Sequence, residues 1–203
     1  MKKLLAQGAE AKIYIENNSI VKERIKKNYR LSEIDQKLRK ERTQMESKML
    51  TMAKRASVLV PRVLDEDTKE MTLTLEFLDG PKVRDWLDKT AQFEPVMEKI
   101  GAMTAKLHNE NITHGDLTTS NLIVKDKDPY IIDLGLAKYT KRSEDKAVDL
   151  HLMKECLKSK HHDKWLKAWK AFIKGYQSKS KDSEEILTRL KTVEARGRYK
   201  KAD

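Results

Sequence analysis

The sequence is short of the residues that build disulfide-bonded and membrane-spanning proteins. It has one cysteine in 203 residues, Cys156, so a disulfide framework is excluded and a buried or half-buried thiol is expected. The opening Met1–Ala6 soon meets charged residues and no long apolar run follows, so we expect neither a signal peptide nor a transmembrane helix. Internal repeats and low-complexity linkers are also missing. We therefore expect a compact cytoplasmic protein that does not use a membrane.

Charge, by contrast, is abundant and unevenly placed. The chain has 43 Lys and Arg against 32 Asp and Glu, a net charge of +11. Residues 22–55 carry 12 basic against 5 acidic side chains and residues 150–203 carry 15 against 7, whereas residues 56–149 carry 13 against 18. Basic segments can neutralise nucleic-acid phosphates, but charged runs also commonly form a solvated surface. Charge alone leaves both interpretations open.

The most informative motif is His114-Gly-Asp-Leu-Thr-Thr-Ser-Asn121, followed twelve residues later by Asp133. Phosphoryl transfer needs an acceptor for the proton of the nucleophile, oxygen ligands for Mg²⁺ and a cation on the triphosphate. Asp116 can be the proton acceptor, and Asn121 and Asp133 can be the Mg²⁺ ligands. The order and spacing match the catalytic segment of kinases.

The residues between Asn121 and Asp133 explain this spacing. The stretch Leu122-Ile-Val-Lys125, a polar turn at 126–129 and the stretch Tyr130-Ile-Ile132 predict a β-hairpin of two short, mainly apolar strands. A hairpin of this size brings its two ends together, so the two side chains can share one cation.

Upstream, residues 7–14 lie between two short strand patterns, where the phosphate-covering loop of a kinase belongs. This loop supplies Gly8, Ala9 and Glu10 as candidate ATP-binding residues, although it has one glycine where typical kinases have three. Residues 19–25 then predict a third strand carrying Lys22, which could pair with the α- and β-phosphates.

A helix is predicted from Ser32 to Arg55, because apolar residues recur there at helical spacing. Glu46 lies beside this apolar stripe and could hold the ammonium of Lys22 in position for the phosphates. Glu41 could compete for that role, so position within the motif decides between them.

The remaining patterns predict an α+β, minimal two-lobed, protein-kinase-like fold. Further strands near 62–64 and 71–76 would complete a five-stranded N-lobe sheet, and Glu76 and Leu78 in the following hinge would meet adenine. Helices are expected at 93–110, 144–159, 161–178 and 182–196. We divide the chain into an N-lobe with one long helix (1–78), a reduced helical C-lobe (79–198) and a basic flexible tail (199–203). The histidines at 108, 151, 161 and 162 show no metal-ligand pattern, and no catalytic role is assigned to them.

Taken together, these motifs resemble those of the Bud-type small atypical protein kinases of the KEOPS (EKC) complex, the p53-related protein kinase family. The resemblance covers essentially the whole chain. It rests on Gly8-Ala-Glu-Ala11, Ile20-Val-Lys-Glu-Arg-Ile-Lys-Lys-Asn-Tyr-Arg-Leu31, Glu41-Arg-Thr-Gln-Met-Glu46, the two catalytic motifs and Arg196-Gly-Arg198. It implies that Lys22 is the ATP-binding lysine, Glu46 its helix partner, Asp116 the catalytic aspartate, and Asn121 and Asp133 the Mg²⁺ ligands.

The resemblance also implies a biological setting. It implies a serine/threonine protein kinase with ATPase activity that uses ATP and Mg²⁺ and acts as a regulatory subunit in the N6-threonylcarbamoyladenosine modification of tRNA. The implied partners are a threonylcarbamoyl-transferase subunit, a small helical adaptor subunit and tRNA. Candidate tRNA contacts are Arg196, Arg198 and Lys200. The lack of long insertions favours an archaeal member.

Two absences bear on the activity. No arginine precedes Asp116 to receive an activation-loop phosphate, and no Ala-Pro-Glu or long activation segment follows Gly135. We therefore expect slow phosphorylation of generic or self sites, or ATP hydrolysis. Two alternatives remain: a small-molecule phosphotransferase of the aminoglycoside or choline kinase type, which shares the His-Gly-Asp loop, and a non-catalytic scaffold.

Overall fold

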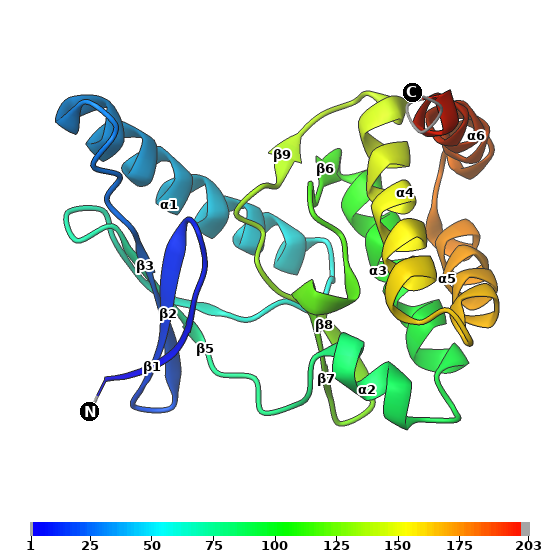
Figure 1. Ribbon diagram of the computed structural model, residues 1–203, viewed down its shortest axis with the longest axis horizontal. Coiled ribbons are helices and arrows are strands. Elements are labelled where there is room, and N and C mark those ends of the chain that lie inside the picture. The colour runs from blue at the N-terminus through cyan, green and yellow to red at the C-terminus, as the bar shows by residue number, and fades with distance from the viewer. Residues whose placement is uncertain (1, 200–203) are drawn as a thin grey trace.

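The computed structural model describes residues 2–199, and side chains up to residue 196. Its first part is a five-stranded antiparallel sheet with the strand order β1-β2-β3-β5-β4. One long helix, α1 (Ser32–Arg55), runs beside the sheet (Figure 1). The strands are β1 (Lys3–Gln7), β2 (Ala11–Glu16), β3 (Ser19–Arg24), β4 (Val63–Asp67) and β5 (Thr72–Glu76).

Local sequence explains how β2 and β3 pair. Asn17 and Asn18, which join them, have φ angles of 48° and 58°, as in the tight turns that match the twist of a hairpin. The turn sets the register in which Ile15 faces Ile20 and Ile13 faces Lys22. Because side chains alternate along a strand, Lys22 and Arg24 both point to the buried side of β3.

The second part of the chain is mainly helical and lies on the other side of the molecule in Figure 1. Its helices are α2 (Val83–Lys89), α3 (Glu94–Asn109), α4 (Ser143–Lys160), α5 (Trp165–Lys179) and α6 (Ser183–Tyr199). Between α3 and α4 lie β6 (Ile112–Thr113), the 3₁₀ turn η1 (Thr119–Asn121), β7 (Leu122–Lys125), β8 (Asp128–Ile131) and β9 (Lys138–Tyr139). The sequence-based prediction of an α+β fold, with a five-stranded sheet and one long helix followed by a helical part, is confirmed.

Helices α3 and α5 approach closely because each presents a glycine to the other. A Cβ on Gly101 would overlap the carbonyl of Phe172, and a Cβ on Gly175 would overlap the carbonyl of Glu98. Phe172 and Tyr176, two aromatic residues four positions apart on α5, are fully buried. Their helical spacing therefore reflects core packing.

Some boundaries differ from those expected. Asp128 and Pro129 belong to β8, because the hairpin turn uses only Asp126 and Lys127, both at positive φ. Helix α5 begins at Trp165 instead of residue 161. Helix α6 continues to Tyr199, so the expected tail at 199–203 begins inside a helix and its other residues lie outside the described part.

One hydrophobic core runs through both parts of the molecule. Leu73 and Leu75 of the sheet, Met49 and Leu50 of α1, and the buried faces of α3 to α6 belong to the same cluster. Cys156 is half-buried, as expected. Among residues 2–199, no helix combines the length and the apolar character needed to cross a membrane.

Candidate active site

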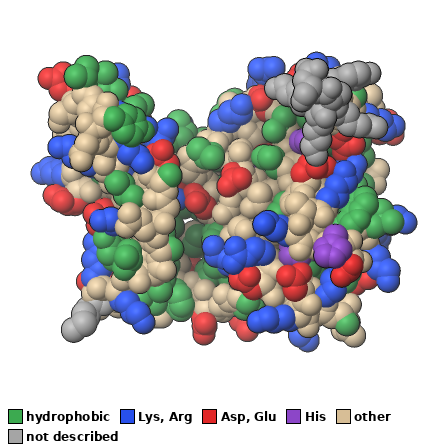
Figure 2. All heavy atoms as spheres, viewed as in Figure 1, with side chains coloured by type: hydrophobic (Ala, Val, Ile, Leu, Met, Phe, Trp, Pro, Cys, Tyr) green, Lys and Arg blue, Asp and Glu red, His purple; other side chains and the backbone are tan. Residues whose placement is uncertain are grey.

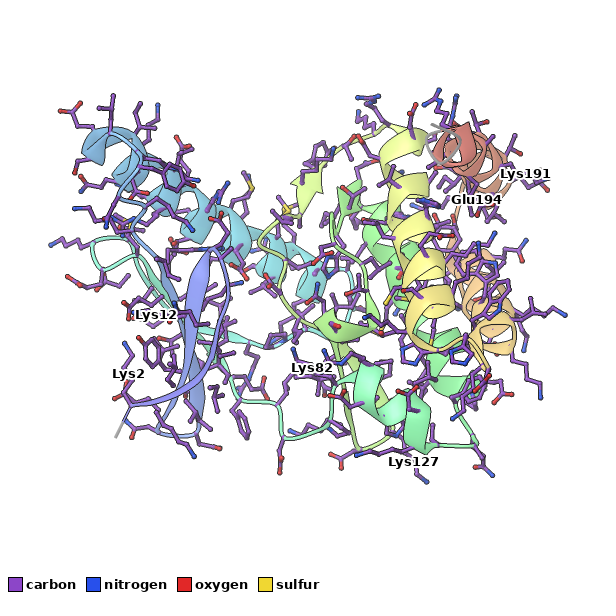
Figure 3. The ribbon with its side chains drawn as sticks, viewed as in Figure 1. Lys2, Lys12, Lys82, Lys127, Lys191 and Glu194 are labelled. Atoms are coloured by element: carbon purple, nitrogen blue, oxygen red, sulfur yellow. The ribbon has the colours of Figure 1, made fainter. Side chains whose placement is uncertain are left out.

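A cavity of about 410 Å³ lies between the sheet and the helical part. Figure 2 shows the surface hollowed there, with charged side chains around the opening. Lys82, which precedes α2 and lines the cavity, lies between the sheet and the helices in Figure 3.

One end of the cavity is an apolar slot. Its walls are aliphatic side chains from the sheet and from the β7–β8 hairpin: Leu5, Ile13, Ile20, Leu75, Ile123 and Ile132. The segment from Glu76 to Gly80 forms its edge. A Cβ on Gly80 would overlap the carbonyl of Val124, so glycine lets this segment pack directly against β7. Aliphatic walls beside the segment 76–80 suit a purine ring.

The other end of the cavity is polar and centres on Lys22. Its Nζ donates to Glu46 Oε1 at 2.7 Å and to Asp133 Oδ1 at 2.6 Å. Glu46 is 1% exposed, whereas Glu41 is exposed and its carboxylate comes only within 4.0 Å of Lys37. The structure therefore brings Glu46, and not Glu41, to the lysine.

The electrostatics of this end favour a charged carboxylate at Asp133. Partial burial acts to raise the pKa of Asp133, but the Lys22 ammonium and the Gly135 N–H outweigh it and lower the pKa. Asp133 is thus held as an anion beside a buried cation, and its side chain is still 51% exposed. An exposed anion on the cavity wall is available to a divalent cation.

The hairpin joins the two predicted metal ligands. The N–H of Ile132 donates to the backbone carbonyl of Asn121 at 2.9 Å, and Asn121 and Asp133 both line the cavity. Asn121 Nδ2 donates to Asp116 Oδ2 at 2.8 Å and to the Asp116 carbonyl at 2.9 Å. Within the described residues, no hydrogen bond occupies the amide oxygen of Asn121 or Oδ1 of Asp116.

The catalytic loop is anchored by a residue that sequence reasoning missed. Asp149 of α4 accepts hydrogen bonds from the backbone N–H of His114 at 2.6 Å and of Gly115 at 2.8 Å. His108 contacts the same carboxylate at 3.2 Å through Nε2, and its Nδ1 lies 2.8 Å from the Tyr176 hydroxyl. Burial raises the pKa of Tyr176, so this phenol keeps its proton beside His108. A charged residue within the buried stripe of α4 was the signal that could have revealed Asp149.

Arg24 was missed as well. It is 7% exposed, and its Nη2 contacts Oε2 of Glu46, the oxygen that Lys22 does not use. The available signal was its position two residues after Lys22, on the same face of a strand.

Of the other predicted ATP-binding residues, some line the cavity and some do not. Gly8, Ala9 and Glu10 form the β1–β2 loop but do not line the cavity, where Leu5 and Ala6 take their place. A Cβ on Gly8 would meet only the Ala11 carbonyl at 3.9 Å, so the fold itself does not require glycine there. Glu76 and Leu78 do line the cavity, and the side chain of Glu76 is held by Arg62 Nε at 3.1 Å.

The candidate tRNA contacts are only partly described. Arg196 is 61% exposed and pairs with Glu144 Oε1 at 2.5 Å. The side chain of Arg198 and all of Lys200 lie outside the described residues.

The donor set fits a magnesium nucleotide. Within residues 2–199, no cluster of three His, Cys, Asp or Glu side chains is arranged to hold a metal ion unaided. Asn121 and Asp133 offer two oxygen ligands beside a lysine, which suits Mg²⁺ because this ion commonly takes its other ligands from phosphates and water.

Comparison with known proteins agrees with this geometry. A family model described as the ABC1 atypical kinase-like domain matches residues 9–177. The KEOPS complex subunit Bud32 of Pyrococcus abyssi is 42% identical, over 98% of this chain and 96% of that protein. The chain belongs to the Bud32 family of atypical kinases.

Other relatives of this Bud32 family member carry related names. A probable serine/threonine-protein kinase BUD32 homolog of Archaeoglobus fulgidus is 41% identical, over 95% of this chain and 94% of that protein. A probable bifunctional tRNA threonylcarbamoyladenosine biosynthesis protein of Methanococcus vannielii is 42% identical over 97% of this chain. The chain spans 36% of that longer protein.

A solved structure shares the fold. The Rio2 kinase of Chaetomium thermophilum, crystallised as an ADP/Mg²⁺-phosphoaspartate complex, matches 98% of this chain and 72% of its own with a TM-score of 0.64 and 12% identity. At that identity the likeness bears on the fold alone. It agrees with the kinase-like architecture of the Bud32 family.

Proposed function

We propose that this chain is an atypical serine/threonine protein kinase and ATPase that uses Mg-ATP and acts as a regulatory subunit of a KEOPS-type complex in N6-threonylcarbamoyladenosine modification of tRNA. The observation that carries the proposal is the polar end of the cavity, where Lys22 meets Glu46 and Asp133 beside an apolar slot. The names of the Bud32 relatives support the tRNA setting.

Each side chain has a distinct task in this proposal. Lys22, held by Glu46, pairs with phosphate oxygens, and the 76–80 segment receives the adenine. Asp116 accepts the proton of the attacking hydroxyl or water through Oδ1, while Asn121 fixes Oδ2. Asn121 and Asp133 supply oxygens to Mg²⁺, which when bound neutralises charge on the phosphates. Residues 1–78 would thus hold the nucleotide and residues 79–198 carry the catalytic loop.

The surroundings of the site support slow turnover. Only the segment from Gly135 to Arg142, which includes the two-residue strand β9, separates Asp133-Leu134 from α4. This leaves little surface to bind a peptide substrate, which favours self-phosphorylation or ATP hydrolysis over rapid work on a defined peptide. The transferase subunit, the small helical adaptor and tRNA are its proposed partners, with Arg196, Arg198 and Lys200 proposed to contact the tRNA.

The deciding experiment is ATP turnover with Mg²⁺ by the full chain and by Asp133→Ala, with and without tRNA and the transferase subunit. We expect wild-type turnover to rise with the partners and Asp133→Ala to lose about a hundredfold, because a metal ligand contributes several kcal/mol to the transition state. Asp128→Ala is the matched control, since Asp128 lies in the same hairpin, pairs with Lys99 at 2.5 Å and is not among the residues that line the cavity. Equal background turnover by wild type and Asp133→Ala in every mixture would favour the scaffold.

A further inference from the structure

Strand β3 places a second cation beside the lysine of the site. Lys22 and Arg24 lie two residues apart on one face of the strand and are 6% and 7% exposed. Lys22 Nζ donates to Oε1 of Glu46 at 2.7 Å, and Arg24 Nη2 contacts Oε2 of the same carboxylate. One glutamate of α1 therefore serves two buried cations, one at each oxygen.

Because Glu46 is buried, each of its two carboxylate oxygens needs a donor of its own. Glu46 is 1% exposed, and a buried carboxylate oxygen without a donor is costly. Because Arg24 satisfies Oε2, Lys22 needs to satisfy only Oε1. Its ammonium can then donate to Asp133 Oδ1 on the cavity wall at 2.6 Å. The arginine thus fixes both the rotation of the carboxylate and the direction in which the lysine points.

Arg24 does not face the nucleotide space itself. It is not part of the lining of the cavity, which Lys22, Glu46 and Asp133 do line. Its guanidinium lies instead behind Glu46 and against Gly135, where an added Cβ would come within 3.1 Å of Arg24 Nη2 and within 3.3 Å of Glu46 Oε2. Arg24 can therefore act on the nucleotide only through Glu46 and the Asp133–Gly135 turn.

We propose that Arg24 is a positioning residue of the nucleotide site, which holds Oε2 of Glu46 so that Oε1 directs Lys22 toward the phosphates. The inference rests on the proposed use of Mg-ATP. A planar guanidinium suits this task better than an ammonium, because its N–H groups donate in fixed directions. Glycine at position 135 suits the same arrangement, since an added Cβ would lie 3.1 Å from both Arg24 Nη2 and Asp133 Oδ1 and would crowd them.

The test measures the dissociation constant of Mg-ATP by isothermal titration calorimetry on the full chain. Arg24→Met should weaken binding about tenfold, the size of a typical coupling between contacting charged residues. Arg24→Lys keeps the charge without the fork and should lose less, about threefold. In a Glu46→Gln background, adding Arg24→Met should change binding by less than about twofold, because the arginine acts through the carboxylate.

Arg39→Met is the matched control for a merely structural effect. Arg39 Nε pairs with the buried Asp35 of the same helix at 2.7 Å, away from the cavity. It should lower the melting temperature, as Arg24→Met does, yet leave Mg-ATP binding unchanged. Equal losses of Mg-ATP affinity in Arg24→Met and Arg39→Met would overturn this inference and leave the proposed function standing. An undiminished effect of Arg24→Met in the Glu46→Gln background would have the same meaning. A wild-type chain that binds no Mg-ATP would overturn the proposed function and this inference with it.

Discussion

At the scale of single residues, Glu46 is the side chain on which two buried cations depend. Lys22 and Arg24 are both buried, and both contact the Glu46 carboxylate. Glu46→Ala should therefore lower the free energy of unfolding by about 3 kcal/mol or more, the usual cost of removing one partner of a buried ion pair. Urea denaturation of the purified chain measures this loss.

Glu41→Ala is the control for that experiment. The Glu41 side chain is 57% exposed, and its carboxylate comes no closer than 4.0 Å to Lys37 Nζ. Its removal should therefore change stability by no more than about 0.5 kcal/mol. Similar losses for the two variants would contradict the structural distinction between these glutamates.

Spacing in the sequence was enough to propose Lys22, Glu46, Asn121 and Asp133 as neighbours, because each belongs to a motif with a known order. It was not enough for Arg24 or Asp149. A strand arginine ordinarily points to solvent, and nothing along the chain shows that this one reaches across to α1. Asp149 accepts hydrogen bonds from backbone N–H groups that lie 34 and 35 residues earlier in the chain. Only tertiary packing brings these groups together.

At the scale of elements, the beginning of α4 depends on a carboxylate in its first turn. Thr140 Oγ1 donates to Asp145 Oδ2 at 2.7 Å and Lys138 Nζ to Oδ1 at 3.0 Å. The Thr140 hydroxyl, more than Lys138, lowers the pKa of Asp145 below its ordinary value of 3.8. Because the pKa of Asp145 is lower in the folded than in the unfolded protein, its ionised carboxylate stabilises the fold at pH values above 3.8. This stabilisation is lost as the pH falls through the folded pKa.

Thr140→Val should therefore destabilise the chain at pH 7 by about 1 kcal/mol, the net worth of a hydrogen bond, and by much less near pH 2.5. Urea denaturation at both pH values measures the difference. Thr192→Val, at an exposed position of α6, should change stability little at either pH. A loss from Thr140→Val that is the same at both pH values would show that Asp145 is not the linked group.

The long helices and the hairpin were predictable because their apolar spacing is regular over many residues. Helix α2 was not, because its seven residues are too few for a period to show. The C-terminal end of α2 is stabilised by a residue of another segment. Lys164 Nζ donates to the carbonyls of Leu87, Asp88 and Thr90 at 2.7, 3.0 and 2.8 Å. Strands β6 and β9 are two residues each and exist only through their mutual pairing.

At the scale of the whole molecule, the basic C-terminal segment is the feature to test for tRNA binding. Deleting residues 196–203 should weaken tRNA association more than Mg-ATP binding, because all the described residues that line the cavity come earlier in the sequence. The slope of log affinity against log salt concentration should also fall, by about 0.7 to 0.9 for each phosphate contact that is lost. Filter binding of tRNA at several salt concentrations measures both effects.

Neutral substitution of Lys2 and Lys12 is a control for the loss of positive charge elsewhere, because these lysines lie beside the sheet, far from Lys191 and Glu194 of α6 in Figure 3. Equal tRNA affinity after the deletion would remove the segment from the proposed interface.

The overall order of a sheet-rich part followed by a helical part was predictable from the sequence. The close crossing of α3 and α5 was not, since a glycine within a helix is ordinarily taken as a weak point rather than as a contact.

The ion pair between Lys22 and Asp133 joins residues that are 111 positions apart in the chain. We expect a contact of such long range to form late in folding, because the entropy of closing a large loop must first be overcome by other interactions. The sheet, α1 and the helices can each gain local structure before this contact exists. The polar end of the cavity is therefore an indicator of completed folding: a chain arrested earlier could have its native secondary structure and still lack a nucleotide site.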